Sequence, residues 1–116
     1  MQSAFYKDGA AIALSAACVV HCVLLPVIAI SSPFVAAVAE AEWLHWIMAV
    51  LALFASTTVV ISSPSARVPT FLIPASFGAI LITSGLFAER FGFAETLPTI
   101  IGGVLIASAH IYRICR

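Results

Sequence analysis

The amino-acid sequence predicts an all-α integral membrane protein, a four-helix transmembrane bundle with both termini on the cytoplasmic side. The chain of 116 residues is 63% hydrophobic and only 9% charged, whereas a soluble domain carries about 25% charged residues. Four long apolar stretches follow one another along the chain, and basic residues gather at alternate boundaries between them. The composition and the four apolar stretches predict the spans, and the placement of the basic residues predicts their orientation.

Composition also limits the kind of protein this can be. A small soluble domain leaves a large share of its surface in water, so a mean hydropathy of +1.17 means that much of the surface faces lipid. The length predicts a single domain over residues 1–116. A net charge of zero offers no basic surface for nucleic acid. Cys18 and Cys22 lie inside an apolar run, unlike the disulfide framework of a secreted protein.

The first two spans are expected near residues 9–30 and 41–62. Each has the roughly 20 apolar residues that a helix needs to cross about 30 Å of hydrocarbon. A backbone in lipid must satisfy its own hydrogen bonds, so these runs are helices rather than open strands. The first run ends before Ser31, Ser32 and Pro33.

The other two spans are expected near residues 68–88 and 95–113, by the same length requirement. A Ser-Ser-Pro-Ser segment at 62–65 precedes the third span, and Glu89-Arg90-Phe91-Gly92 separates it from the fourth. Small residues recur at helical spacing in spans two to four, which favours close helix packing in lipid.

Charge placement predicts the orientation. With four spans, the N-terminus, the second loop and the C-terminus share one side, and the first and third loops share the other. The first side carries Lys7, Arg67, Arg113 and Arg116; the second carries Arg90 with Glu40, Glu42, Glu89 and Glu95. The positive-inside rule then places both termini in the cytoplasm.

The first span contains the cluster most suggestive of chemistry. Cys18, His21 and Cys22 have spacings of three and four, which put them on one helical face. A free cysteine alone is often a small buried hydrophobe, but an ionisable histidine inside a membrane segment is costly and marks a functional site. Thiolate and imidazole ligands suit mercury, copper(I) or zinc. The cluster therefore predicts a soft-metal site.

Two further histidines are candidates with alternatives. His45 lies about one turn inside the outer face, at a depth that Cys22 shares, and is the best additional metal ligand; otherwise it is an interfacial histidine between Trp43 and Trp46. His110 lies near the inner end of the fourth span at the depth of Asp8. His110 and Asp8 are either an inner handoff point for the metal or simply hydrogen-bonded to each other.

Glu95 and Cys115 are weaker metal candidates. Glu95 begins the fourth span, where a carboxylate attracts cations but also stabilises the helix macrodipole. Cys115 lies beside Arg116 at the cytoplasmic end, where a basic neighbour favours the thiolate. It is either an exit ligand or a terminal thiol without a role.

The chain resembles the MerC-like mercury resistance membrane protein family over nearly its whole length. The resemblance rests on the following residues, in order: Asp8, Ser15, Cys18, His21, Cys22, Pro26, Glu42-Trp43-Leu44-His45, Glu95-Thr96-Leu97, Gly102-Gly103, Ala109-His110 and Arg113-Ile114-Cys115-Arg116. It implies a multi-pass protein of the bacterial inner membrane that takes up Hg2+ for reduction in the cytoplasm. A periplasmic metal carrier and a cytoplasmic reductase are the partners that such uptake implies.

The leading hypothesis is therefore mercuric ion uptake by exchange between Cys and His ligands, with the ion as substrate and no cofactor required. Zn2+ or Cu+ is the alternative cargo, and a membrane sensor or storage protein for these metals is the alternative function. A membrane thiol oxidoreductase is the third, although cysteines four apart on a helix are awkwardly placed for a disulfide. A small multidrug exporter would need a carboxylate near Cys18, where the chain has none.

No enzyme is expected otherwise, because the polar residues do not form a Ser-His-Asp set at matching depths. The lipid bilayer and a soft metal ion are the partners that the residues themselves imply. Bundles of four short helices often pair, so a homodimer is left open.

Overall fold

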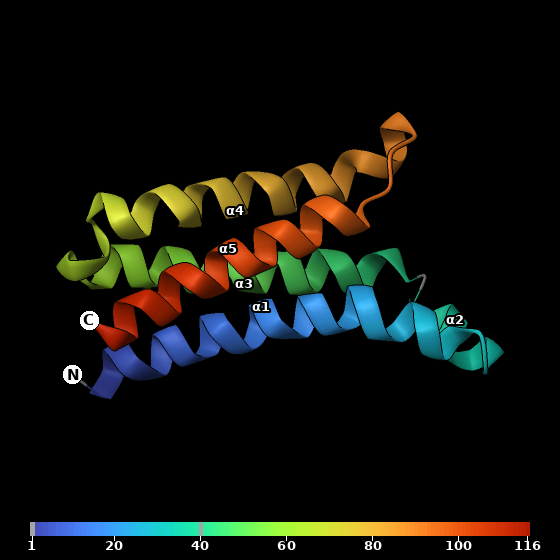
Figure 1. Ribbon diagram of the computed structural model, residues 1–116, viewed down its shortest axis with the longest axis horizontal. Helices are drawn as coiled ribbons and strands as arrows, with labels where there is room; N and C mark the ends of the chain where they lie inside the picture. Colours follow the sequence, from blue (N-terminus) through green and yellow to red (C-terminus); the bar gives the residue numbers. More distant parts are fainter. Residues whose placement is uncertain (1, 40) are drawn as a thin grey trace.

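The computed structural model describes residues 2–39 and 41–116, in which four long helices lie roughly parallel to one another (Figure 1). The long helices are α1 (Gln2–Ala29), α3 (Glu42–Ser62), α4 (Pro69–Ala88) and α5 (Thr96–Cys115). The short elements are α2 (Pro33–Ala39) and the 3-10 turns η1 (Pro64–Ala66) and η2 (Glu89–Phe91). Four helices are long and apolar enough to cross a membrane, which confirms the predicted all-α chain with four such helices.

Two elements differ from the expected ranges. Helix α1 begins at Gln2 rather than near residue 9, because nothing before Gly9 breaks a helix and Lys7 and Asp8 both find partners on other helices. The connection after α1 contains the seven-residue helix α2. Pro33 begins it with a φ already suited to a first helical turn, and α2 packs against α1.

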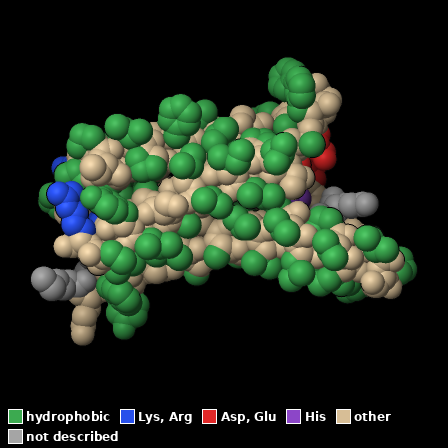
Figure 2. Space-filling model, in the orientation of Figure 1, with side chains coloured by type: hydrophobic (Ala, Val, Ile, Leu, Met, Phe, Trp, Pro, Cys, Tyr) green, Lys and Arg blue, Asp and Glu red, His purple; other side chains and the backbone are tan. Residues whose placement is uncertain are grey.

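The two ends of the bundle differ in charge (Figure 2). At the termini end, where both chain ends lie together (Figure 1), Lys and Arg side chains gather. At the opposite end, called here the acidic end, glutamate side chains and a histidine are visible. Glu42, Glu89 and Glu95 belong to the helix ends there; Glu40, grouped with them in the sequence, lies outside the described residues.

Between the ends, the surface is apolar, as a lipid-facing surface requires. Large side chains such as Phe54, Phe77 and Ile80 are each more than 60% exposed. The interior face instead carries small residues. Helix α5 is central to the packing, since it contacts α4 most extensively and also α1, which in turn packs against α3.

The α4–α5 contact depends on facing glycines. A Cβ added to Gly78 would lie 2.6 Å from the carbonyl oxygen of Gly102, and one added to Gly102 would lie 2.7 Å from that of Gly78. Nearer the acidic end, a Cβ on Gly85 would lie 2.6 Å from the Thr99 hydroxyl oxygen. The two backbones can therefore approach this closely only without side chains, as expected for helix contacts in lipid.

The termini end is also closed by an arginine cap. Arg67 donates from Nε to the carbonyl oxygen of Val60 at 3.1 Å and from Nη2 to that of Ile61 at 2.9 Å. These carbonyls belong to the last turn of α3, which has no helical partners for them. A cation at a helix C-terminus is also favoured by the macrodipole. Arg67 therefore stabilises the end of α3 both by hydrogen bonding and by its charge.

The glycine contact generates a stability prediction. Gly102→Ala forces a methyl group into the Gly78 backbone, and overpacking of this kind costs about 1–3 kcal/mol of unfolding free energy. Gly9→Ala is the matched control, since nothing lies within 4 Å of its added Cβ, and its effect should stay within about 1 kcal/mol. Unfolding by SDS in mixed micelles, followed by circular dichroism, measures both. Equal stability of the two variants would contradict the proposed contact.

Candidate metal centre

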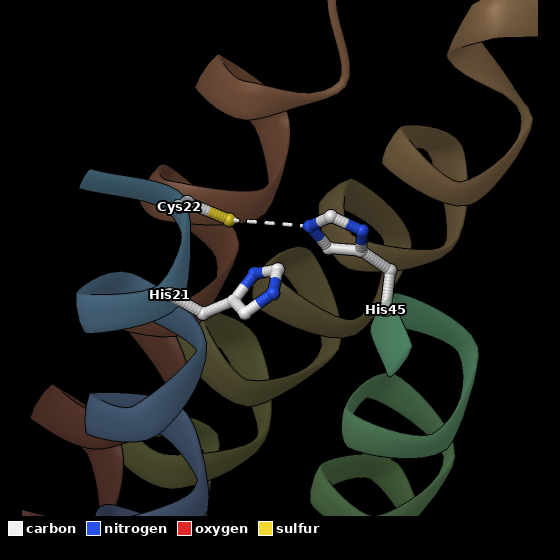
Figure 3. A group of neighbouring side chains, drawn as sticks. All are labelled: His21, Cys22 and His45. Atoms are coloured by element: carbon white, nitrogen blue, oxygen red, sulfur yellow. Dashed lines mark hydrogen bonds between the residues drawn. The ribbon is translucent and has the colours of Figure 1, made fainter. Parts of the chain in front are cut away.

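Three side chains from two helices converge near the acidic end. His21 and Cys22 are consecutive residues of α1, and His45 lies in the first turns of α3. Figure 3 shows the three side chains pointing toward one another across the gap between the helices. Because α1 and α3 run in opposite directions, residues separated by more than twenty positions reach the same depth.

The donor atoms of this group are close together. The Cys22 Sγ lies 3.8 Å from the His45 Nε2 (Figure 3), and one ligand atom from each of the three residues lies within 4.8 Å of the others. The His21 and His45 rings meet edge to face with centroids 4.5 Å apart. His21 and Cys22 are 6% and 8% exposed, so the group is well shielded from solvent.

These distances fit a small metal ion. Zinc bonds of about 2.0–2.1 Å to nitrogen and 2.3 Å to sulfur place neighbouring ligands of a tetrahedral site about 3.6 Å apart. The observed separation of the Cys22 sulfur from the His45 nitrogen, 3.8 Å, is close to this value, and the His21 ligand atom lies within 4.8 Å of both. A set of one thiol and two imidazoles suits soft and borderline cations rather than Mg2+ or Ca2+.

Among the described residues, His21 and Ser15 have buried side-chain polar atoms without a hydrogen-bond partner. Neither ring nitrogen of His21 makes a hydrogen bond to any other described residue, although both are buried. A buried polar atom without a partner costs about 1–3 kcal/mol, so such atoms are rare in folded proteins. A bound cation would give one of these nitrogens the partner that the surrounding helices do not provide.

Glu95 lies behind His45, on the side away from Cys22. Its Oε1 is 3.4 Å from the His45 Nδ1. Burial, reinforced by the carboxylates of Glu89 and Glu42, raises the pKa of Glu95. Metal-binding histidines commonly pair their second nitrogen with a carboxylate, which fixes the tautomer and the ring orientation. Glu95 is therefore placed to orient His45 rather than to join the three-residue group.

Cys18 is separated from the other three predicted ligands. It lies one turn of α1 toward the termini end and outside the group of three. It is 4% exposed and lines a cavity of about 10 Å3, to which His45 and Glu95 also contribute. Cys18 and Cys22 are both free thiols.

A second polar cluster, here the inner network, lies near the termini end. The fully buried His110 contacts the Asp8 Oδ1 at 2.6 Å through Nδ1 and the Ser56 Oγ at 3.1 Å through Nε2. Arg113 donates from Nη1 to both oxygens of Asp8 at 2.7 Å. His110 and Asp8 are thus hydrogen-bonded, the second of the two alternatives considered for them, and the cluster joins α1, α3 and α5.

The inner network corrects the expectation that no Ser-His-Asp set occurs at matching depths. Ser56, His110 and Asp8 do form such a chain. Ser56 had no distinguishing signal beyond its place on the small-residue stripe of α3. It lies inside a helix whose N–H groups are occupied by helical hydrogen bonds, so no pair of backbone donors can form an oxyanion hole beside it.

Cys115 lies apart from both clusters. It is exposed in the last turn of α5, and its helical position separates it from His110. It is accessible to reagents at the termini end, whereas Cys18 and Cys22 are buried.

The match to a known family is consistent with this arrangement. The family model of the MerC mercury resistance protein matches residues 8–115. The chain belongs to the MerC mercury resistance family. Together with the four apolar helices, membership in the MerC family indicates a multi-pass membrane protein. No curated protein and no solved structure matches the chain significantly.

The position of Glu95 generates a binding prediction. Glu95→Gln removes the carboxylate that lies 3.4 Å from the His45 Nδ1, and we expect the affinity for Hg2+ to fall about 10- to 100-fold, as for other carboxylates behind a histidine ligand. Competition with a chelating thiol measures this in Cys115→Ser protein, because the exposed Cys115 thiol would itself bind Hg2+. Glu89→Gln removes an exposed carboxylate from the same end and is the control. Equal losses in both variants would argue for a general charge effect instead.

Proposed function

We propose that the protein carries Hg2+ across the bacterial inner membrane, from the periplasm into the cytoplasm, by exchange of the ion between Cys and His ligands. The observation that carries this proposal is the buried group of His21, Cys22 and His45, whose donor atoms lie within 4.8 Å of one another. Membership in the MerC mercury resistance family supports mercury as the cargo.

The charges at the two ends support an inward direction. The carboxylates of Glu42, Glu89 and Glu95 lie at the acidic end, nearest the three-residue group, and would attract a cation there (Figure 2). The basic residues lie at the termini end, and the positive-inside rule favours a cytoplasmic location for them. A periplasmic carrier would then deliver the ion at the acidic end, and a cytoplasmic reductase would receive it at the termini end.

Ligand chemistry supports exchange rather than permanent binding. The Cys22 thiol must lose its proton to bind as a thiolate, and His21 and His45 must be neutral. Hg2+ binding therefore releases protons, and affinity should fall as the pH is lowered. A ligand set from only two helices can open when α1 and α3 shift relative to each other, which allows the ion to leave.

A storage or sensor protein for zinc or copper is the second candidate. The separation of the Cys22 sulfur from the His45 nitrogen, 3.8 Å, is close to that of a tetrahedral zinc site, and storage would use the same residues. Transport requires that the bound ion reach the opposite side, which storage does not.

Flux through proteoliposomes separates the two functions. Wild-type protein should carry Hg2+ to a trapped fluorescent chelator, and Cys22→Ala should lower the initial rate more than about tenfold, because the central thiolate is lost. The rate should also fall at acidic pH. Val23→Ala, which truncates the adjacent exposed side chain, should leave the rate nearly unchanged. Tight Hg2+ binding by wild-type protein without flux would overturn the transport proposal.

The orientation has its own test, which uses the difference in exposure among the cysteines. Cys115 is exposed and the other two cysteines are buried, so a membrane-impermeant maleimide should report the side on which Cys115 lies. It should label inside-out vesicles and leave intact spheroplasts unlabelled, and Cys115→Ser should abolish the signal. Labelling of intact spheroplasts would place the termini end in the periplasm and reverse the proposed direction.

A further inference from the structure

A second pair of soft donor atoms lies one helical turn deeper than the three-residue group. Cys18 precedes Cys22 by four residues on α1, and Met48 follows His45 by three residues on α3. With a rise of about 1.5 Å per residue, these side chains start about 6 Å and about 4.5 Å closer to the termini end. The displacement has the same direction on both helices, because α1 and α3 are antiparallel.

The two deeper residues line one cavity. Cys18 and Met48 both border the cavity of about 10 Å3, which His45 and Glu95 also line. That volume is about the size needed to hold one water molecule, and hence one ion. Cys18 is 4% exposed and Met48 is half-buried.

The chemistry of this lining differs from that of an ordinary apolar void. A thioether is a soft ligand that carries no proton to lose, and thiolate and thioether together select soft cations. His45 adjoins both the three-residue group and the cavity. Its Nε2 faces Cys22 and its Nδ1 faces Glu95, which lines the cavity. One imidazole could therefore remain bound while the sulfur ligands change.

The cavity also adjoins a buried apolar cluster. Ala49 and Ile82 border the cavity and pack with Ile106 in this cluster. Further along α1, the Ser15 hydroxyl is buried without a hydrogen-bond partner among the described residues, and Asp8 of the inner network follows. An ion moving inward would have to pause here until this cluster opens.

We propose that Cys18 and Met48, together with His45, form a second soft-metal site that receives the cation from His21 and Cys22. This inference rests on the proposed transport function and adds a thioether ligand to it. In the transfer, the metal bonds to the Cys22 sulfur and the His21 nitrogen break, and bonds to the Cys18 and Met48 sulfurs form. The Cys18 proton passes to the Cys22 thiolate, so no redox partner is needed.

Sulfur counting by X-ray absorption tests the site without reference to transport. In Cys22→Ser/Cys115→Ser protein loaded with one equivalent of Hg2+, the ion should have two sulfur ligands, from Cys18 and Met48. Adding Met48→Leu, which nearly conserves volume, should leave one. Adding Leu51→Met as well restores the composition of α3 on an exposed position, and the count should remain one. A count that does not change with Met48→Leu would overturn the site.

Flux then separates this inference from the proposed function. Met48→Leu in the otherwise wild-type chain should still bind Hg2+ at the three-residue group, while the initial rate falls about tenfold. Unchanged flux in Met48→Leu, with normal flux in wild type, would overturn the second site as a transfer step and leave the transport function intact. Absent flux in wild type, with the two-sulfur site present in Cys22→Ser/Cys115→Ser protein, would overturn transport and support the site.

Discussion

The close approach of α4 and α5 at Gly78 and Gly102 is the constraint on which the remaining packing depends. Each glycine lies where a Cβ would meet the other's carbonyl oxygen, so the two backbones are in direct contact. This contact places α5 where it can also pack against α1. Gly103 continues the contact on that side, since its added Cβ would lie 3.3 Å from Val19 and 3.4 Å from the Ser15 carbonyl oxygen.

Because α5 is central, it supplies the polar partners at both ends of the bundle. Near the acidic end, Glu95, the residue that caps the start of α5, lies 3.4 Å from His45 of α3. Near the termini end, His110 and Arg113 hold Asp8 of α1. A charge in lipid is costly unless it is paired, and the Asp8 carboxylate is paired with both His110 and Arg113. His21 is the contrasting case, since both of its buried ring nitrogens lack a partner among the described residues. The inner network is therefore satisfied by protein groups alone, and the described residues leave the His21 ring without a hydrogen-bond partner.

Much of the fold could be predicted from the sequence, because the requirement for about 20 apolar residues per span leaves few alternatives. The face shared by Cys18, His21 and Cys22 also followed from helical spacing. What spacing could not show is which residues of the other helices lie at the depth of Cys18, where His45, Met48 and Glu95 border the same cavity.

Partners distant in the sequence were harder to predict. The Asp8–His110 hydrogen bond was one of the alternatives expected from a shared depth, but the pairing of Asp8 with Arg113, 105 residues away, was not expected. Ser56 and Met48 resembled ordinary helix residues, since a serine or a methionine inside an apolar run is usually structural. Only the three-dimensional arrangement shows that Ser56 contacts His110 and that Met48 lines a cavity. Helix α2 was missed because seven apolar residues between two serines and an acidic segment are too few for a span.

The metal content of the purified protein tests most directly whether this bundle binds a soft cation between α1 and α3. The measurement compares Cys115→Ser protein with Cys18→Ala/Cys22→Ala/Cys115→Ser protein after incubation with Hg2+ and removal of excess ion. We expect about one Hg2+ per chain in the first and almost none in the second, because both interior thiolates are lost. Equal mercury content in the two proteins would contradict a site between α1 and α3.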